Sequence, residues 1–143
     1  MIKEILKIAE DNEMGVIPVI DNYALQVELD RFVKTGDRAM FIMLPRQEEL
    51  RYNAYSEYRS VSVEIVAAGR TPFGSSDRQD FDNVEDMSAQ LKQDLRRFID
   101  MILSTGMYEI VDRVRYTVIP YRYDSFCTAV TAQFTLTKAD DPC

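Results

Sequence analysis

One stretch decides the fold: residues 84–103, which read VEDMSAQLKQDLRRFIDMIL. Its apolar side chains recur at intervals of three and four residues, the spacing of one face of an α-helix. Charged residues occupy the opposite side of the same helix. The apolar set predicts an amphipathic helix lying on a hydrophobic core, and it consists of Met87, Leu91, Leu95, Phe98, Ile99, Ile102 and Leu103.

Acidic residues crowd the expected start of this helix: Asp77, Asp80, Asp82, Glu85 and Asp86. Asp82 is in position to cap the helix, and Glu85 stands three residues later, as in a capping box. Negative charge also stabilises a helix N-terminus, so we interpret the segment as capping. A Ca²⁺ loop is the alternative, but the glycine and distal glutamate of an EF-hand are missing.

Strand patterns lie on both sides of the helix. Residues 110–119 and 125–137 follow it, and apolar and polar residues alternate through the second run. Residues 39–44 form a continuous apolar run, typical of a strand buried on both faces. Residues 50–68 read as one strand of roughly 60 Å at about 3.3 Å per residue. Because that exceeds a domain of this size, we expect part of it to bend or to project as a hairpin arm.

The remaining segments complete the predicted fold. Residues 2–13 have helical spacing, residues 16–20 form a short β-prone run, and residues 23–33 fit either an edge strand or a helix. Residues 69–82 read as a loop, so the loop or arm region covers about 50–82. The order predicts a single α+β domain over residues 1–143, with an antiparallel or mixed sheet and two α-helices packed on one face.

Composition narrows the class of protein. The 143 residues are 46% hydrophobic and 29% charged, as in a globular domain. No apolar run approaches the roughly 20 residues that cross a bilayer. The first residues lack the pattern of a secretory signal, so we expect synthesis in a cytoplasm. The net charge of −7 argues against tight binding of a phosphate backbone as the main role.

Residues that carry chemistry are sparse. Histidine is absent, which removes the usual general base and the commonest transition-metal ligand. Cys127 lies in an apolar run and reads as a buried reduced thiol, with no disulfide indicated. Residues 69–76 have P-loop glycine spacing, but Ser75 stands where the motif needs lysine. We therefore expect no enzyme activity, no metal and no cofactor.

Tyrosines and arginines are interleaved around residues 51–59 and 113–123. Single-stranded nucleic-acid binders use this mixture for stacking and charge, but protein–protein interfaces are enriched in the same residues. Because the chain is acidic, an interface is the preferred interpretation. The predicted oligomer interface consists of Tyr52, Tyr55, Tyr58, Arg59, Arg70, Phe73 and Phe81.

The region from residue 60 to residue 143 carries a family resemblance. A strand (Val61–Val66) and a long loop precede Asp82-Asn83-Val84-Glu85-Asp86-Met87 and the long helix. A strand, Pro120, a polar turn with Tyr123-Asp124 and a last strand follow, before Asp140-Asp141-Pro142-Cys143. This pattern resembles small virion proteins from the head–tail gene modules of phages and prophages of Bacteroidetes, including crAss-like phages. It is also similar to tail-terminator and tail-completion proteins of long-tailed phages.

The resemblance implies a structural subunit of a head–tail joint, neck or tail-terminator ring, without a cofactor. Such a subunit would be made in the host bacterial cytoplasm and end in the virion. Its partners would be copies of itself and neighbouring neck or tail proteins, with DNA only as passing cargo and no membrane. The alternative is a small non-catalytic binding or regulatory module, including a nucleic-acid-associated one, and an enzyme is the third possibility.

Overall fold

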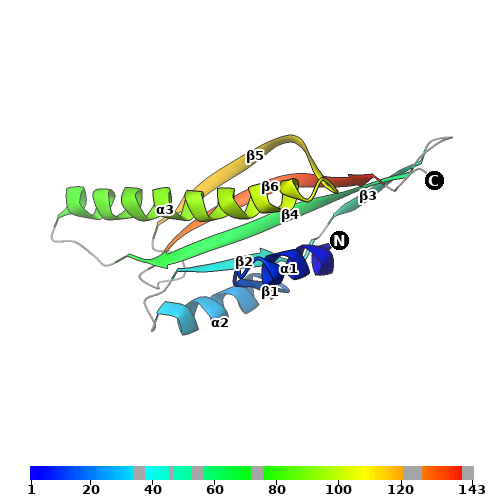
Figure 1. Ribbon diagram of the computed structural model, residues 1–143. Helices are drawn as coiled ribbons and strands as arrows, with labels where there is room; N and C mark the ends of the chain where they lie inside the picture. Colours follow the sequence, from blue (N-terminus) through cyan, green and yellow to red (C-terminus); the bar gives the residue numbers. More distant parts are fainter. Residues whose placement is uncertain (34–37, 46, 53–56, 72–75, 121–126, 140–143) are drawn as a thin grey trace.

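Six strands form one mixed sheet in the computed structural model, which describes residues 1–33, 38–45, 47–52, 57–71, 76–120 and 127–139 (Figure 1). The strand order is β1 (Val16–Val19), β2 (Ala39–Met43), β4 (Glu57–Arg70), β6 (Cys127–Ala139) and β5 (Glu109–Ile119), and β3 (Glu48–Tyr52) also pairs with β4. β1 runs parallel to β2, and the other pairs are antiparallel. The predicted α+β class with a mixed sheet is confirmed.

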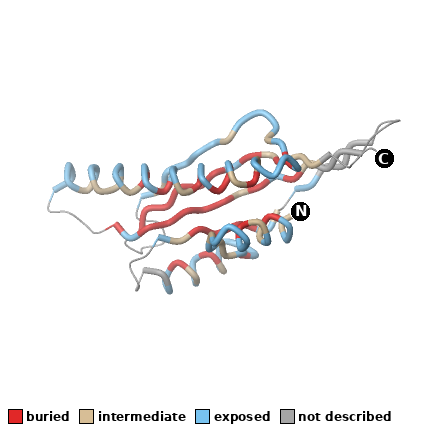
Figure 2. The backbone as a smooth tube through the Cα atoms, in the orientation of Figure 1, coloured by how far each residue is buried: buried red, intermediate tan, exposed pale blue. Residues whose placement is uncertain are grey.

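Two helices, α1 (Ile2–Asp11) and α3 (Asp77–Ser104), share one face of this sheet. Leu91, Leu95 and Phe98 of α3 are fully buried, as is Ile5 of α1. They pack on every second residue of β4 and β6, because successive strand side chains point to opposite faces. Figure 2 shows these buried segments facing each other across the layer. The apolar stripe of residues 84–103 is therefore the core face, as predicted.

A third helix, α2 (Asn22–Val33), covers the other face; the two helices predicted on one face are present, but this third helix was not part of the prediction. Leu25 and Leu29 are buried there, whereas Val27 between them is 43% exposed. A strand would place all three side chains on one side, whereas a helix places Leu25 and Leu29, four residues apart, on one face and Val27 on another. The segment that fitted either a strand or a helix is thus a helix.

The single long strand expected over residues 50–68 is two strands. β3 and β4 form an antiparallel hairpin whose register runs from Glu48 opposite Val61 to Tyr52 opposite Glu57. The same start of β4 pairs with the end of β6 on its other side, for example at Ser60 and Thr137. The hairpin alternative was therefore correct, and these three strand ends form an extension of the sheet that we call the arm. Residues 53–56, between β3 and β4, lie outside the described residues.

Helix α3 begins at Asp77, seven residues before the predicted position. The Ser76 hydroxyl caps it by accepting a hydrogen bond from the Gln79 backbone N–H at 3.2 Å. β4 continues to Arg70, so the predicted loop over residues 69–82 was wrong, and Asp82 and Glu85 lie inside the helix instead of capping it. Although α3 has 28 residues, no helix in the described ranges is long and apolar enough to cross a membrane.

Cys127 opens β6 and is buried without a disulfide, which confirms the prediction of a buried free thiol. Burial raises the pKa of this thiol. A thiol in this environment is mostly protonated at neutral pH and is a weak nucleophile.

Candidate assembly surfaces

The predicted interface residues fall into two groups in the structure. The arm carries Tyr52 at the end of β3, and Tyr58 and Arg59 at the start of β4. The opposite end of β4 carries Arg70, and Phe81 lies nearby in sequence on α3. Tyr55 and Phe73 lie outside the described residues, as do the side chains of Tyr52, Tyr58 and Arg59.

These two groups do not form one surface. Tyr58 and Arg70 are twelve residues apart on a single strand, which separates them by roughly 40 Å at about 3.3 Å per residue. The predicted set therefore does not describe one contiguous patch, and each end of the molecule needs its own description.

At the Arg70 end, the start of α3 extends beyond the end of β4 (Figure 1). We call residues 77–86 the α3 projection; at 1.5 Å per residue it is about 15 Å long. The first α3 side chain that packs on the sheet is Met87, whose sulfur lies over Gly69 so closely that a Cβ there would approach it to 2.5 Å. Within the projection no residue is buried, and Phe81 is 67% exposed.

The projection continues the apolar stripe of α3 past its cover. Phe81 and Val84 stand seven residues before Ser88 and Leu91, so each pair lies on the same helix face two turns apart. Leu91 and Ser88 are buried, whereas Phe81 is 67% exposed. The projection also carries five carboxylates and one arginine, a net charge of −4.

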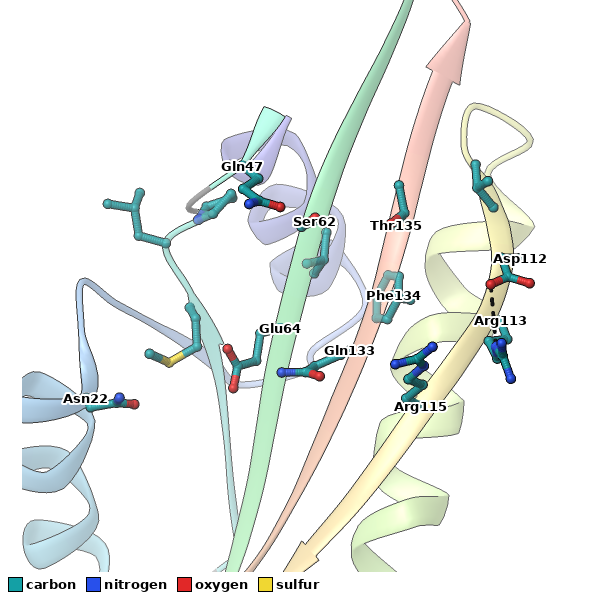
Figure 3. A pocket seen from close by; sticks show the side chains of 15 residues that line it. Asn22, Gln47, Ser62, Glu64, Asp112, Arg113, Arg115, Gln133, Phe134 and Thr135 are labelled. Carbon is teal, nitrogen blue, oxygen red and sulfur yellow. Dashed lines mark hydrogen bonds and ion pairs between the residues drawn. The ribbon is translucent and has the colours of Figure 1, made fainter. Parts of the chain in front are cut away.

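On the opposite sheet face, next to α2, lies an open groove of about 610 Å³ (Figure 3). α2 covers Val66 and Ala68 of β4, but it does not cover Ser62 and Glu64. The floor of the groove is therefore formed by β4 and β6. One wall is Met43–Pro45 at the end of β2, and the other is residues 111–115 of β5.

Polar side chains form a row across the floor. Glu64 of β4 is paired in register with Gln133 of β6, which is paired with Arg115 of β5. Figure 3 shows the three side chains lying along one line across the strands. Among the described residues, Arg115 makes no ion pair or hydrogen bond. The groove therefore presents a guanidinium that has no partner in the described part of the chain.

A β-bulge shapes the wall on β5. Asp112 has a φ of 71°, and the register of β5 against β6 shifts between Val111 and Arg115. Arg113 lies beside Asp112, with 3.4 Å between Nε and Oδ2, and both side chains are exposed. Val111 is 47% exposed and lines the groove, while Leu44 on the opposite wall is 58% exposed. The groove thus has exposed apolar side chains on both walls, and on the β5 wall the cations Arg113 and Arg115 stand beside the carboxylate of Asp112.

β5 is also an edge strand, because in the described part of the sheet it pairs only with β6. Its free edge carries backbone groups that can bond to another chain. Tyr116 and Val118 are partly exposed on the face that carries α3, opposite to the groove. The β5 edge and the groove together give this side of the molecule a broad exposed surface.

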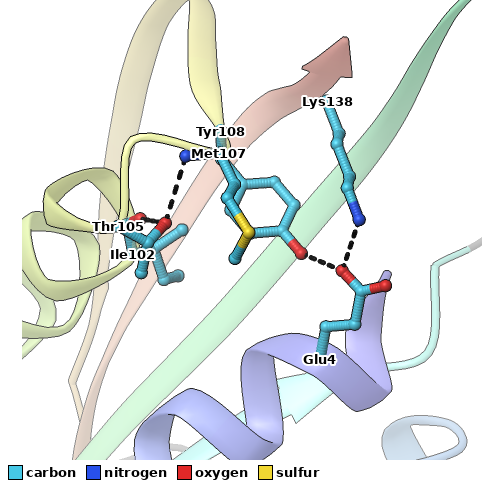
Figure 4. Close-up of polar contacts among 6 residues, drawn as sticks. All are labelled: Glu4, Ile102, Thr105, Met107, Tyr108 and Lys138. Atoms are coloured by element: carbon cyan, nitrogen blue, oxygen red, sulfur yellow. Dashed lines mark hydrogen bonds and ion pairs between the residues drawn. The ribbon is translucent and has the colours of Figure 1, made fainter. Parts of the chain in front are cut away.

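A polar cluster joins α1 to the sheet near the arm (Figure 4). The Tyr108 hydroxyl and the Lys138 ammonium both donate to the Glu4 carboxylate, the latter over 2.8 Å. Hydrogen bonds from Lys138 and then Tyr108 lower the pKa of Glu4 to about 2. The pKa of Tyr108 is raised, mainly by burial of the hydroxyl and secondly by the Glu4 carboxylate. The cluster is an ion pair that fastens the first turn of α1 to the end of β6.

Among the described residues, no group of three His, Cys, Asp or Glu side chains could hold a metal ion. The groove offers guanidinium, amide, hydroxyl and carboxylate groups, which are suited to recognition by hydrogen bonds and charge.

Comparison of the sequence with models of known protein families finds no match, and a search of curated proteins finds none either. The functional inference therefore depends on these surfaces and on the resemblance described above.

Sequence reasoning missed the groove, although it noticed some of its residues. Gln133 and Thr135 were recognised as the polar side of an alternating strand, and Arg113 and Arg115 as part of an interleaved segment. The alternation correctly identifies a face that no helix covers at that point. What it does not contain is the length of α2, which decides where the cover ends.

Proposed function

We propose that this chain is a structural subunit of a phage head–tail joint or tail-terminator-type neck ring. It assembles through protein–protein contacts with copies of itself around the DNA channel. The resemblance over residues 60–143 suggests this role. The absence of histidine from the sequence is consistent with a role that needs no general base.

The observation that carries the proposal is the position of the exposed surfaces. The α3 projection lies at the Arg70 end of β4, on the face with α1 and α3. The groove lies nearer the arm, on the face with α2. A subunit of a ring touches two neighbours through two different surfaces, because a head-to-tail contact is heterologous. A two-fold dimer needs only one self-complementary patch.

The test is to locate the chain in phage particles from a strain that carries its gene. Immunogold labelling of purified particles should place the label at the junction of head and tail, and the same antibody pre-absorbed with the purified chain serves as control. Quantitative mass spectrometry of those particles should find a small, fixed copy number per particle. Unlabelled intact particles, with the chain left in the host lysate, would contradict the proposal.

One observation favours a second candidate, a nucleic-acid-associated module: Arg113 and Arg115 lie close together at the groove. Phosphate contacts by two arginines would give affinity that falls with salt. Filter binding of a single-stranded oligonucleotide should then weaken in the Arg113→Ala/Arg115→Ala variant. The net charge of −7 opposes this candidate, so we place it second.

A further inference from the structure

We propose that the groove of one copy receives the α3 projection of the next copy. This inference rests on the proposed function, because it names the contact through which the ring would be built. The occupant is residues 77–86 of a second copy of this chain, with Phe81 as the central side chain.

Charge complementarity supports this occupant. The projection has a net charge of −4. The groove carries Arg113 and Arg115 together with the carboxylates Asp112 and Glu64, and Asp112 pairs with Arg113, so Arg115 is the cation that faces an acidic partner. Glu85 is four residues from Phe81 and so lies on the same helix face, where its carboxylate can approach a guanidinium beside the apolar contact. A guanidinium accepts a carboxylate in a two-bond fork, and Arg115 is unpaired among the described residues. Complementary charges at an interface also fix which surface meets which.

The apolar groups match as well. On the projection, Phe81 is 67% exposed and Val84 beside it is half-buried, and neither belongs to a buried core cluster of the described residues. Leu44 and Val111, on the two walls of the groove, are exposed in the same way. An amphipathic helix commonly binds a groove through apolar side chains three or four residues apart. The volume of about 610 Å³ is within the range of roughly 300–1,000 Å³ that encloses groups of this size.

The contact must form between different copies. The projection and the groove are on opposite faces of the sheet, since α3 packs on one face and the groove adjoins α2 on the other. No movement of α3 that keeps Leu91, Leu95 and Phe98 buried would bring Phe81 to the groove of its own chain. Docking therefore joins each copy to a next copy, which is the head-to-tail arrangement that closes into a ring.

Disulfide trapping between two different chains tests the contact. All chains carry Cys143→Ser, which leaves only the buried Cys127 as a native thiol. One chain carries Phe81→Cys, and its partner carries Val111→Cys at the groove or, as a matched control, Val118→Cys on the same strand but the other face. After mixing and mild oxidation, the Phe81–Val111 pair should give the mixed disulfide as the main product, and the Phe81–Val118 pair should give only background.

The outcomes separate this inference from the function on which it rests, with sedimentation of the reduced chains as the second measurement. If the chains assemble but both pairs cross-link equally, or if the main disulfide joins two chains that both carry Phe81→Cys, the proposed docking is wrong and the proposed function as a ring subunit is unaffected. Chains that neither sediment as assemblies nor cross-link at any concentration, in the absence or presence of particle components, would overturn both. Selective Phe81–Val111 cross-linking supports both.

Discussion

The same substitution, phenylalanine to alanine, should change the free energy of unfolding by very different amounts at two positions of α3. Phe98 of α3 is fully buried (0% exposed) in the core against the sheet, whereas Phe81 in the projection is 67% exposed. Phe98→Ala should lower the free energy of unfolding by about 3–5 kcal/mol, through lost burial and the cavity left behind. Phe81→Ala should change it by less than about 1 kcal/mol.

The second magnitude follows from the exposed fraction. Complete burial of a phenylalanine is worth about 1.5–3 kcal/mol, and only a third of the Phe81 surface is covered, so its loss costs roughly 0.5–1 kcal/mol. The better helix propensity of alanine at an exposed site returns up to about 0.5 kcal/mol. Urea unfolding followed by far-UV circular dichroism measures both variants at low protein concentration, with the slope m as a check on the transition. A cost above about 2 kcal/mol for Phe81→Ala would refute a projection that stands clear of its own subunit.

Four further substitutions probe the described contacts. Ser76→Ala should cost about 1 kcal/mol of unfolding free energy and Asp82→Ala less than about 0.5 kcal/mol, because only Ser76 caps α3. If urea titrations show the larger loss for Asp82→Ala, then Asp82 is the cap. Thr131→Val should stabilise the fold by up to about 1 kcal/mol, because the buried Thr131 hydroxyl has no partner among the described residues, and a thermal-melt midpoint that falls would contradict this. In the Glu4→Gln variant, the free energy of unfolding should fall less steeply as the pH is lowered. The pKa of Glu4 in the folded chain is about 2, below the ordinary value of 4.5, so the stabilisation by this carboxylate is complete above about pH 4.5 and is lost as the pH falls towards 2. If the unfolding free energy of the variant and of the unchanged chain falls equally steeply with pH, this reasoning is wrong.

The helix and the strand with the longest periodic patterns could be predicted from the sequence. Seven apolar residues at helical spacing identify α3, and the alternation from Val130 to Leu136 identifies β6, because each pattern repeats often enough to exclude the other period. α2 has a shorter pattern, in which the buried side chains described are Leu25 and Leu29, and the intervening Val27 imitates a strand. A pattern that short is resolved only by what packs against it, here Phe41 and Val66.

The ends of elements were harder for a physical reason. Ser76 and Asp82 are both good N-cap residues, and the chain between them has the acidic character of a first helical turn. Sequence spacing does not rank the two, since the apolar stripe is covered only from Met87 onward. The resulting error hid the projection; Phe81, which was predicted as an interface residue, is exposed on it.

The groove could not be predicted because it depends on three separate chain segments. Its depth depends on the last residues of β2, on the end of the α2 cover and on the bulge at Asp112. The bulge also aligns Arg115 with Gln133, and a regular strand pairing would change that register. None of these relations is visible in local spacing, although the polar residues that alternate along β6, Gln133 and Thr135 among them, mark the floor of the groove.

The most direct measurement of the central claim is sedimentation velocity on two variants, alone and mixed. Arg115→Glu disables the groove, and Phe81→Glu disables the projection, while each chain keeps its other surface. The unchanged chain should form large closed assemblies, each variant alone should remain a monomer, and an equimolar mixture should stop at a dimer with one intact joint. Mixed variants that form the full assembly, or single variants that assemble like the unchanged chain, would contradict a ring built from these two surfaces.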